Sequence, residues 1–257
     1  MMVARALRAG PGAARALRGA GTGQVEIVLD GGGGYASLGH DRWVLLSHPR
    51  AQHGPLSLHV ASLGPLAAGM PARVMDGRLE IGDRRIALAG VRVVGRRRMR
   101  ASRVGPPVCE PCRAELRAGV ERLACGDVAA AVDLLAGRGE GLTPAGDDVL
   151  AGYAGWMATT ASSVRVAEAA ADRTTGLSLA YLRCAERGEL PAAADALIAA
   201  LGRRDAAAAA RSARALAGWG ATSGRALIVG MDAAARRCRA RPAPAPRSGP
   251  AVPSPRR

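Results

Sequence analysis

The sequence predicts an α+β protein, with an N-terminal antiparallel β barrel or sandwich followed by an all-helical C-terminal domain. Short β-type runs alternate with turn residues from Val25 to Val94. From residue 112 to residue 237, apolar residues recur at helical spacing instead. The chain has 257 residues, of which 49% are hydrophobic, so it is long enough to bury a substantial core.

Changes of composition along the chain indicate where its parts begin and end. A basic, proline-containing stretch without periodicity separates the two folded regions, and both ends of the chain lack acidic residues. The expected parts are a disordered Arg-rich extension (1–24), a small β domain (25–95), a connector (96–111), a helical domain (112–237) and a disordered Pro- and Arg-rich tail (238–257). The N-terminal stretch lacks the continuous apolar core of a secretory signal.

The strands of the β half are predicted from short runs rich in β-branched and apolar residues. These runs are VEIVL, YASL, WVLL, LSLHVASL, ARVM, RLEI, RIAL and VRVV. Asp76-Gly77 and Gly82-Asp83 separate consecutive runs and are typical of two-residue hairpin turns. The DGGGGY stretch from Asp30 is not followed by a helical pattern, so it indicates a turn between strands rather than a phosphate-binding loop.

The helical half is predicted from apolar residues three and four positions apart. The expected helices cover residues 112–125, 127–136, 144–161, 164–171, 174–187, 191–202, 205–217 and 222–237. In the third of these, Gly152 lies one turn after Asp148 and Gly155 follows three residues later. Because glycine has no side chain, that face of the helix is open to close approach by a second helix.

The net charge of +15 is concentrated at the two ends of the chain. Residues 1–24 hold four Arg and no acid, and residues 236–257 hold seven Arg and no acid, so the remainder carries only +4. Aromatic residues, which stack on the bases of single-stranded nucleic acids, make up only 2% of the chain. Nucleic-acid binding is therefore not expected of the folded part, although binding through the ends remains an alternative.

Several other classes are disfavoured by the composition. The five cysteines are an odd number, and Cys109 and Cys112 form a C-x-x-C pair that lacks a second pair for zinc. The histidines all lie in the β half, and no G-x-S-x-G, Walker or H-E-x-x-H motif is found. The longest apolar run, from Val149, is too short to span a bilayer. We expect a cytoplasmic protein that does not enter a membrane.

The stretch GRGEGLTPAGDDVLAG, residues 137–152, combines a helix start with features that a helix start does not need. Thr143 suits the N-cap, and Pro144 suits the first helical position. Asp147 and Asp148 fall near the first turn, yet two adjacent carboxylates repel each other and a cap needs one at most. The pair could hold a cation for phosphate binding or recognise an amide-type group. Surplus capping and helix packing form the structural alternative.

Two further stretches share this plan. GWGATSG, from Gly218, places Thr222 and Ser223 as candidate caps before an apolar helix. Thr174 precedes another helix, and Ser178 lies one turn after it. If two glycine-rich helix starts face each other, backbone N–H groups, hydroxyls and the Asp pair would line one polar pocket.

Taken in order, GRGEGLTPAGDD, TTGLSLAYLRCAERGE and GWGATSG resemble the AllH-like family, which includes a subunit of oxamate carbamoyltransferase. The resemblance runs from about Val25 to Arg236. It implies a subunit of an enzyme complex that transfers a carbamoyl group between phosphate and the nitrogen of oxamate, in purine and allantoin nitrogen catabolism. The implied partners are the other subunits and a small anionic substrate.

The resemblance carries over to named positions of this chain. Pro144, Asp147 and Asp148 are among the matching positions. We expect the two aspartates to be the catalytic residues, and the pair could also hold Mg²⁺, while no other cofactor is expected. The implied substrate-binding residues are Gly141, Thr143, Gly146, Thr174, Ser178, Thr222, Ser223 and Gly224.

This chain departs from the family pattern at some positions. Ala145 stands where the family often has Ser, and Val149 stands where a larger apolar residue is usual. Arg225 and Ala226 follow the Ser-Gly step, where an acidic residue is expected. A non-catalytic scaffold subunit, in which the same motifs serve assembly, is the alternative function.

Overall fold

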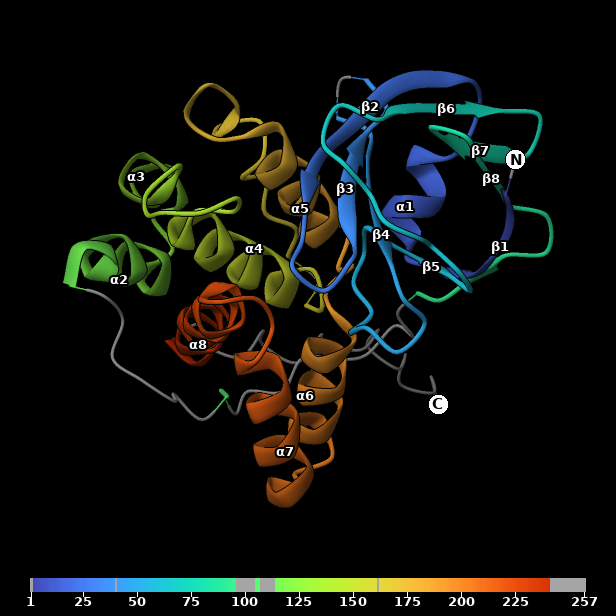
Figure 1. Cartoon of the computed structure of the whole chain (residues 1–257). Coiled ribbons are helices and arrows are strands. Elements are labelled where there is room, and N and C mark those ends of the chain that lie inside the picture. Colours follow the sequence, from blue (N-terminus) through green and yellow to red (C-terminus); the bar gives the residue numbers. More distant parts are fainter. Residues whose placement is uncertain (1, 40, 96–104, 107–113, 161, 241–257) are drawn as a thin grey trace, which may run out of the picture.

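A computed structural model describes residues 2–39, 41–95, 105–106, 114–160 and 162–240 of the chain (Figure 1). The strands are β1 (Met2–Ala9), β2 (Gly21–Val28), β3 (Gly34–Ser37), β4 (Trp43–Ser47), β5 (Ser57–Val60), β6 (Pro71–Met75), β7 (Arg78–Ile81), β8 (Arg84–Ala87) and β9 (Arg92–Val93). The helices are α1 (Pro11–Ala16), α2 (Arg117–Cys125), α3 (Val128–Leu135), α4 (Ala145–Met157), α5 (Gly176–Glu186), α6 (Ala192–Gly202), α7 (Ala206–Ala217) and α8 (Ser223–Ala240), with short 3₁₀ turns η1 (Ala114–Leu116) and η2 (Ala171–Arg173). The predicted α+β class, with strands first and helices after, is confirmed.

The N-terminal half forms a closed barrel. The strand order is β5-β4-β3-β2-β6-β7-β8-β1, and a further pairing of β1 with β5 closes the ring, while β9 adds to the end of β1. Most neighbours are antiparallel, but β4 and β5 are parallel, as are β1 and β8. Closure leaves the barrel without the long free edges of an open sheet.

The sequence predicts a disordered extension over residues 1–24, and the structure contradicts this. Strand β1 pairs with β8 through Met2–Arg5 and with β5 through Ala6–Ala9, so the barrel needs it for closure. Alanines alternate with exposed residues along β1, and Ala4 and Ala6 are buried in the barrel core. Alanine has weak strand propensity, which is why this alternation resembles an Arg-rich tail in the sequence.

Both predicted hairpin turns are confirmed. Asp76 and Gly77, between β6 and β7, both have positive φ (50° and 71°), as a two-residue turn with matching twist requires. Gly82, between β7 and β8, has φ 57°. The barrel core is filled by small and branched side chains, including Val25, Leu46 and Leu79.

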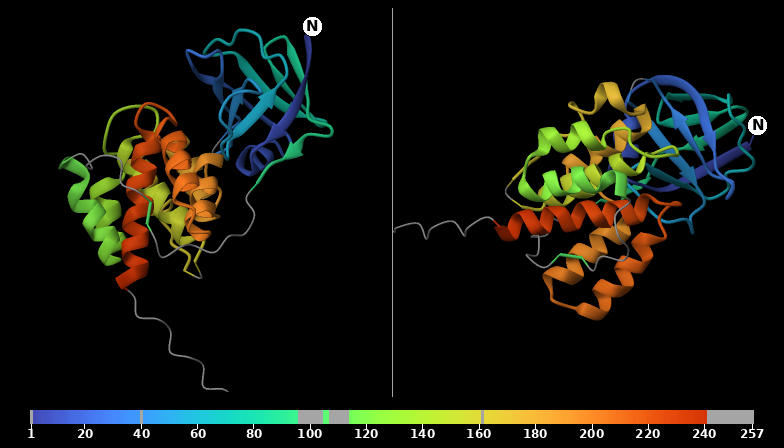
Figure 2. Two further views of the ribbon diagram at one scale, coloured as in Figure 1. Left: turned by 90° about the horizontal axis from the view of Figure 1, so that it is seen from below. Right: turned by 90° about the vertical axis from the view of Figure 1, so that its left-hand side faces the viewer.

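The helical half is built around α4, every residue of which is buried. Helix α8 crosses α4 at close range, as Figure 1 shows. A Cβ atom on Gly152 of α4 would lie 2.1 Å from the carbonyl oxygen of Leu227, and one on Gly230 of α8 would lie 1.9 Å from that of Val149. The prediction of a close helix contact at Gly152 is therefore confirmed. Helices α6 and α7 form a hairpin beside this pair (Figure 2).

One predicted helix is wrong. Residues 164–171 form a turn that leads into η2 rather than a helix. The Glu186 carboxylate accepts the backbone N–H groups of Val166 and Ala167 at 2.7 and 2.8 Å, and thereby holds this segment in a non-helical path. The C-x-x-C cysteines, Cys109 and Cys112, and residues 241–257 of the expected tail lie outside the described residues.

The two halves meet along one side of the barrel. Arg15 of α1 forms an ion pair with Glu189, which follows α5. Leu56 before β5 packs with Leu177 and Cys184 of α5 in a small hydrophobic cluster. These contacts hold the barrel against the helical half. In the described part of the chain, no helix combines the length and the apolarity needed to cross a bilayer.

Candidate functional site

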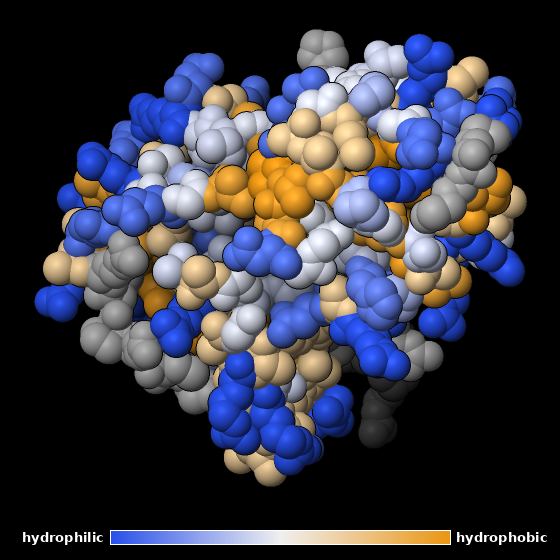
Figure 3. Space-filling view, in the orientation of Figure 1, coloured by the Kyte–Doolittle hydropathy of each residue, from blue (hydrophilic) through white to orange (hydrophobic). Residues whose placement is uncertain are grey.

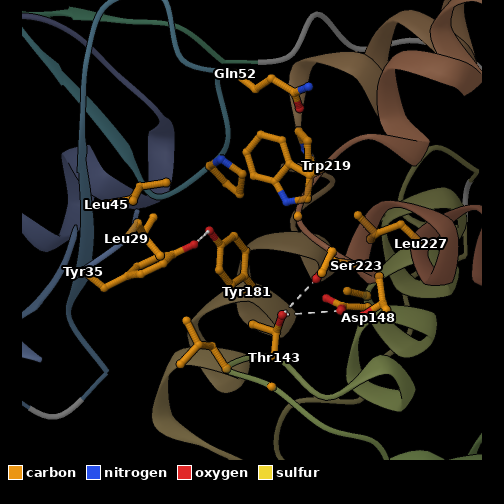
Figure 4. Close-up of a pocket in the computed structure, with 18 of the residues that line it drawn as sticks. Leu29, Tyr35, Leu45, Gln52, Thr143, Asp148, Tyr181, Trp219, Ser223 and Leu227 are labelled. Carbon is orange, nitrogen blue, oxygen red and sulfur yellow. Dashed lines mark hydrogen bonds between the residues drawn. The ribbon is translucent and has the colours of Figure 1, made fainter. Parts of the chain in front are cut away.

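A cavity of about 850 Å³ lies between the barrel and the helical half. One wall comes from the barrel and includes Leu29, Tyr35 and Leu45. The other comes from the starts of α4 and α8 and from α5 (Figure 4). We call them the barrel wall and the helical wall. A ligand in this cavity would touch both halves of the protein.

The two glycine-rich helix starts singled out in the sequence meet at the helical wall. The hydroxyl oxygens of Thr143, just before α4, and Ser223, the first residue of α8, are 3.1 Å apart, although 80 positions separate them in the chain. Thr143 Oγ1 also donates to Asp148 Oδ2 at 3.4 Å. Thr143, Asp148 and Ser223 thus form one hydrogen-bonded group facing the cavity (Figure 4).

Thr143 does not cap α4, contrary to the prediction. The N-cap is Pro144, with φ −52° and ψ 141°, and no side chain caps the helix. The Pro144 carbonyl accepts the backbone N–H groups of Asp147 and Asp148 at 2.9 and 3.2 Å. Because the backbone satisfies the first turn, the Thr143 hydroxyl remains available to the cavity.

Asp148 is the buried carboxyl group of the cavity. Its side chain lines the cavity and is only 7% exposed. Burial, together with the nearby charge of Asp147, raises its pKa to about 7, although hydrogen bonds from Ser223 and Thr143 oppose the rise. A carboxyl group with this pKa exchanges a proton readily near neutral pH, which is the property of a general acid or base.

Asp147 has a different environment. Its Oδ1 accepts the Gly137 N–H at 2.9 Å, and its Oδ2 accepts the Thr174 hydroxyl. Burial raises the pKa of Asp147, while Thr174, Gly137 and Ser178 favour its charged form. Asp147 therefore joins the turn after α3 to the residues before α5. Successive residues of a helix point about 100° apart, so the two aspartates face different neighbours.

The two carboxylates do not converge on one point that could hold Mg²⁺. Magnesium requires several oxygen ligands in near-octahedral geometry. Both oxygens of Asp147 already accept hydrogen bonds, whereas Asp148 faces the cavity. Among the residues that the structure describes, no group of three or more His, Cys, Asp or Glu side chains is placed to hold a metal ion. The donor set does not fit a metal ion shared by the two aspartates.

The motif glycines divide into two kinds. Gly141 lines the cavity with φ 97°, a conformation that favours glycine, and no atom crowds it. A Cβ on Gly146 would lie 2.0 Å from the Leu135 carbonyl oxygen, and one on Gly224 would lie 1.7 Å from that of Leu216. These last two glycines let neighbouring backbones approach.

The structure thus brings together only some of the residues predicted from the sequence. Those lining the cavity are Gly141, Thr143, Asp148, Thr222 and Ser223. Those lying behind it, in contacts between turns and helices, are Gly146, Asp147, Thr174, Ser178 and Gly224. Ser178 is 1% exposed and is the third residue of α5, where it favours the charged form of Asp147 and does not line the cavity.

The sequence reasoning missed the aromatic residues of the cavity. Tyr35, Tyr181 and Trp219 line it (Figure 4), and they are three of the only six aromatic residues, three Trp and three Tyr, in the chain. The hydroxyl oxygens of Tyr35 and Tyr181 are 3.0 Å apart across the two walls, and their rings meet edge to face. Burial raises the pKa of both, so the pair stays protonated at neutral pH. Their rarity in the chain was the signal that could have identified them.

The helical wall lies in the part of the chain that matches a known protein family. Residues 135–235 match the family model described as oxamate carbamoyltransferase subunit AllH. This span contains both glycine-rich helix starts and all the residues of the helical wall, whereas the barrel lies outside it. No curated protein and no solved structure matched the chain.

Proposed function

We propose, from the match of residues 135–235 to the family model of oxamate carbamoyltransferase subunit AllH, that this chain is a subunit of a carbamoyltransferase-type enzyme complex. In the specific form of the proposal, the complex resembles oxamate carbamoyltransferase. It transfers a carbamoyl group between phosphate and the nitrogen of oxamate in the cytoplasm, as a step in purine-ureide nitrogen catabolism.

One observation carries the proposal. Thr143, Asp148 and Ser223 come from two motifs that are far apart in the sequence, yet they form one hydrogen-bonded group at a buried end of the cavity. A buried carboxyl group with no cation among its hydrogen-bond partners costs stability. Natural proteins retain such groups mainly where they serve a function. The matched family span covers all three residues.

The arrangement supplies what carbamoyl transfer requires. The acceptor nitrogen forms a bond to the carbamoyl carbon, the bond from that carbon to the phosphate oxygen breaks, and the phosphate leaves with the electron pair. The nitrogen must also lose a proton. Asp148, with a pKa of about 7, can accept this proton in its ionised form.

The hydroxyl groups beside Asp148 have a complementary task. In the resting site Thr143 and Ser223 donate their single protons to the Asp148 carboxylate. Once Asp148 takes up the proton, the two hydroxyls can turn to donate hydrogen bonds to the carbamoyl oxygen as negative charge develops on it. The start of α8 adds the positive end of a helix dipole on the same side of the cavity. Positioning and charge stabilisation would then provide most of the catalysis, without a covalent intermediate.

The test is an assay of the assembled complex. The chain is co-expressed with candidate partner subunits, and the purified complex is supplied with carbamoyl phosphate and oxamate, while phosphate release and oxalurate are measured. We expect turnover that Asp148→Asn lowers by about 100-fold or more, in line with loss of a general base. Asp172→Asn, at an exposed position outside the cavity, is the matched control.

Normal turnover by a folded Asp148→Asn complex would show that the site assignment is incorrect. If the complex turns over other acceptors but not oxamate, the carbamoyltransferase class stands and the named substrate does not.

The scaffold alternative also has an observation in its favour. Gly146, Asp147 and Gly224 hold turns and helices together rather than facing the cavity. If the chain is only a scaffold, substitutions at Asp148 and Ser223 would leave turnover intact, and only substitutions that disturb assembly would lower it. The two functions are therefore distinguished by the same assay, combined with size-exclusion chromatography of each variant complex.

A further inference from the structure

The charged side chains of the cavity are acidic. Glu140, Asp148 and Glu189 line it, and no arginine is found among its described lining residues. This is unexpected because the 36 basic residues of the chain are all arginines. Arg15 pairs with Glu189, but it does not itself line the cavity. Transfer to or from phosphate requires cations on the phosphate oxygens, and the described lining does not supply them.

The cavity is also larger than the reactants of the proposed function require. Its volume of about 850 Å³ is near the top of the range of about 300–1,000 Å³ for pockets that hold drug-sized molecules. Carbamoyl phosphate and oxamate are both far smaller. Space therefore remains for a further occupant beside them.

The opening of the cavity has an apolar part. Leu142 lines the opening and is 45% exposed, on the same turn as Glu140. Figure 3 shows hydrophobic residues gathered near the middle of this face of the molecule, where the barrel and the helical half meet. Exposed apolar surface at the mouth of a pocket is typical of a protein contact site.

We infer that a basic segment of another subunit of the complex enters this cavity and that its Arg or Lys side chains neutralise the phosphate. The inference rests on the proposed carbamoyltransferase function. Charge complementarity supports it. Glu189 is already paired with an arginine, but the exposed Glu140 and the ionised form of Asp148 attract a basic segment and repel an acidic one. The long stems of Arg and Lys side chains could lie against Tyr35 and Trp219, whose ring faces attract cations.

Site-specific cross-linking in the assembled complex tests the contact. A photo-reactive benzoylphenylalanine replaces Leu142 at the opening or, as the control, Leu134, which is 38% exposed on α3 and does not line the cavity. We expect residue 142 to cross-link to an Arg- or Lys-containing peptide of another subunit, identified by mass spectrometry, and residue 134 not to do so. Cross-links from residue 142 only within this chain, or only to peptides without Arg or Lys, would overturn the inference.

A charge reversal gives an independent measurement. Glu140→Arg should weaken binding of the partner subunit by about tenfold, with an effect that shrinks at high salt. Glu168→Arg, an equal charge change at an exposed position outside the cavity, should have little effect. Equal effects of the two variants would contradict docking at the cavity.

The source of the cations is tested with inorganic phosphate as the probe. Phosphate should raise the melting temperature of the assembled complex but not that of the isolated chain, since only the complex holds both the cavity and the basic segment. Strong phosphate binding by the isolated chain would overturn the inference. If the cross-link forms but no carbamoyl transfer occurs, the proposed function is wrong and the docking of the basic segment is supported. If carbamoyl transfer occurs without the cross-link, the proposed function is supported and the docking is wrong.

Discussion

The two walls of the cavity differ in chemistry and in packing. The helical wall presents Thr143, Asp148 and Ser223 in one hydrogen-bonded group, whereas the barrel wall presents mainly apolar and aromatic groups such as Leu29 and Tyr35. The family match covers the first wall and not the second. In the proposed function, the helical wall would carry the chemistry and the barrel wall would shape the space available to the ligand.

The two walls also differ in how tightly they are held. The helical wall rests on the crossing of α4 and α8, where backbones touch at Gly152 and Gly230. The barrel contacts the helices through side chains, in a small cluster around Leu56 and Leu177 and in the hydrogen bond between Tyr35 and Tyr181. Substitutions should therefore cost much stability behind the helical wall and little at the barrel wall.

The largest effect is expected at the helix crossing. Gly152→Ala would place a methyl group 2.1 Å from the Leu227 carbonyl oxygen, so the two helices must separate. We expect a loss of about 2–4 kcal/mol in the free energy of unfolding, measured with urea. Gly31→Ala, at a turn where nothing lies within 4 Å, is the control. Equal losses for the two variants would contradict the difference in packing.

The next effect depends on pH and arises from Asp148. Its pKa of about 7 in the folded protein is above the ordinary value of 3.8, so the folded state binds more protons between these two pH values. Its contribution to stability is therefore fully present below about pH 4 and is lost as the pH rises through 7. Asp148→Asn should be more stable than the parent by about 2–3 kcal/mol at pH 8 and by little at pH 4.

Unfolding by urea at both pH values measures this difference between the variant and its parent. A gain of the same size at pH 4 and pH 8 would exclude titration of Asp148 as its cause.

Asp147→Asn should change the stability in the opposite direction and lower the free energy of unfolding. Its carboxylate accepts hydrogen bonds from Gly137 and Thr174, and an asparagine can accept only through its one carbonyl oxygen. We expect a loss of about 1–2 kcal/mol in the free energy of unfolding at neutral pH. Asp172→Asn serves again as the control. A variant at residue 147 that is as stable as the parent would remove the distinction between the two aspartates.

The smallest effect is expected at the barrel wall. Tyr35→Phe removes the hydroxyl that meets Tyr181 at 3.0 Å, at a cost of about 0.5–1 kcal/mol. In the active complex we expect a rise of about two- to fivefold in KM and a smaller change in kcat, because the wall contributes to binding more than to the chemical step. Tyr153→Phe, on α4 and outside the cavity lining, is the comparison. A fall in kcat larger than the rise in KM would indicate that Tyr35 takes part in the chemical step.

Much of the fold could be predicted because local signals agreed with it. The hairpin at Asp76-Gly77 could be predicted from the sequence because its backbone needs residues that tolerate positive φ. Strand β1 could not be predicted from the sequence, because a strand with alternating alanines is stable only when it pairs with β5 and β8. The helix over 164–171 failed for a similar reason, because Glu186, distant in sequence, binds the backbone there.

The candidate site was predictable on one wall only. The excess of glycine and acid around Asp148 indicated a pocket, and its assembly with Ser223 followed from the shared plan of the two helix starts. The division between Asp147 and Asp148 depends on which neighbours each side chain meets, and the sequence does not contain that. Tyr35 comes from another part of the fold and belongs to no motif, so only its rarity in the chain pointed to it.

Strand β1 also has a consequence for how the chain folds. It is synthesised before its partners in β5 and β8, which follow about 50 to 80 residues later in the chain. Until then its backbone groups have no strand to pair with, so closure of the barrel depends on long-range contacts, which form slowly. A shortened chain that begins at residue 25 would leave the edges of β5 and β8 unpaired, and such edges favour aggregation. The Arg-rich segment before residue 25 is therefore a part of the barrel, and a shortened form of the protein should keep it.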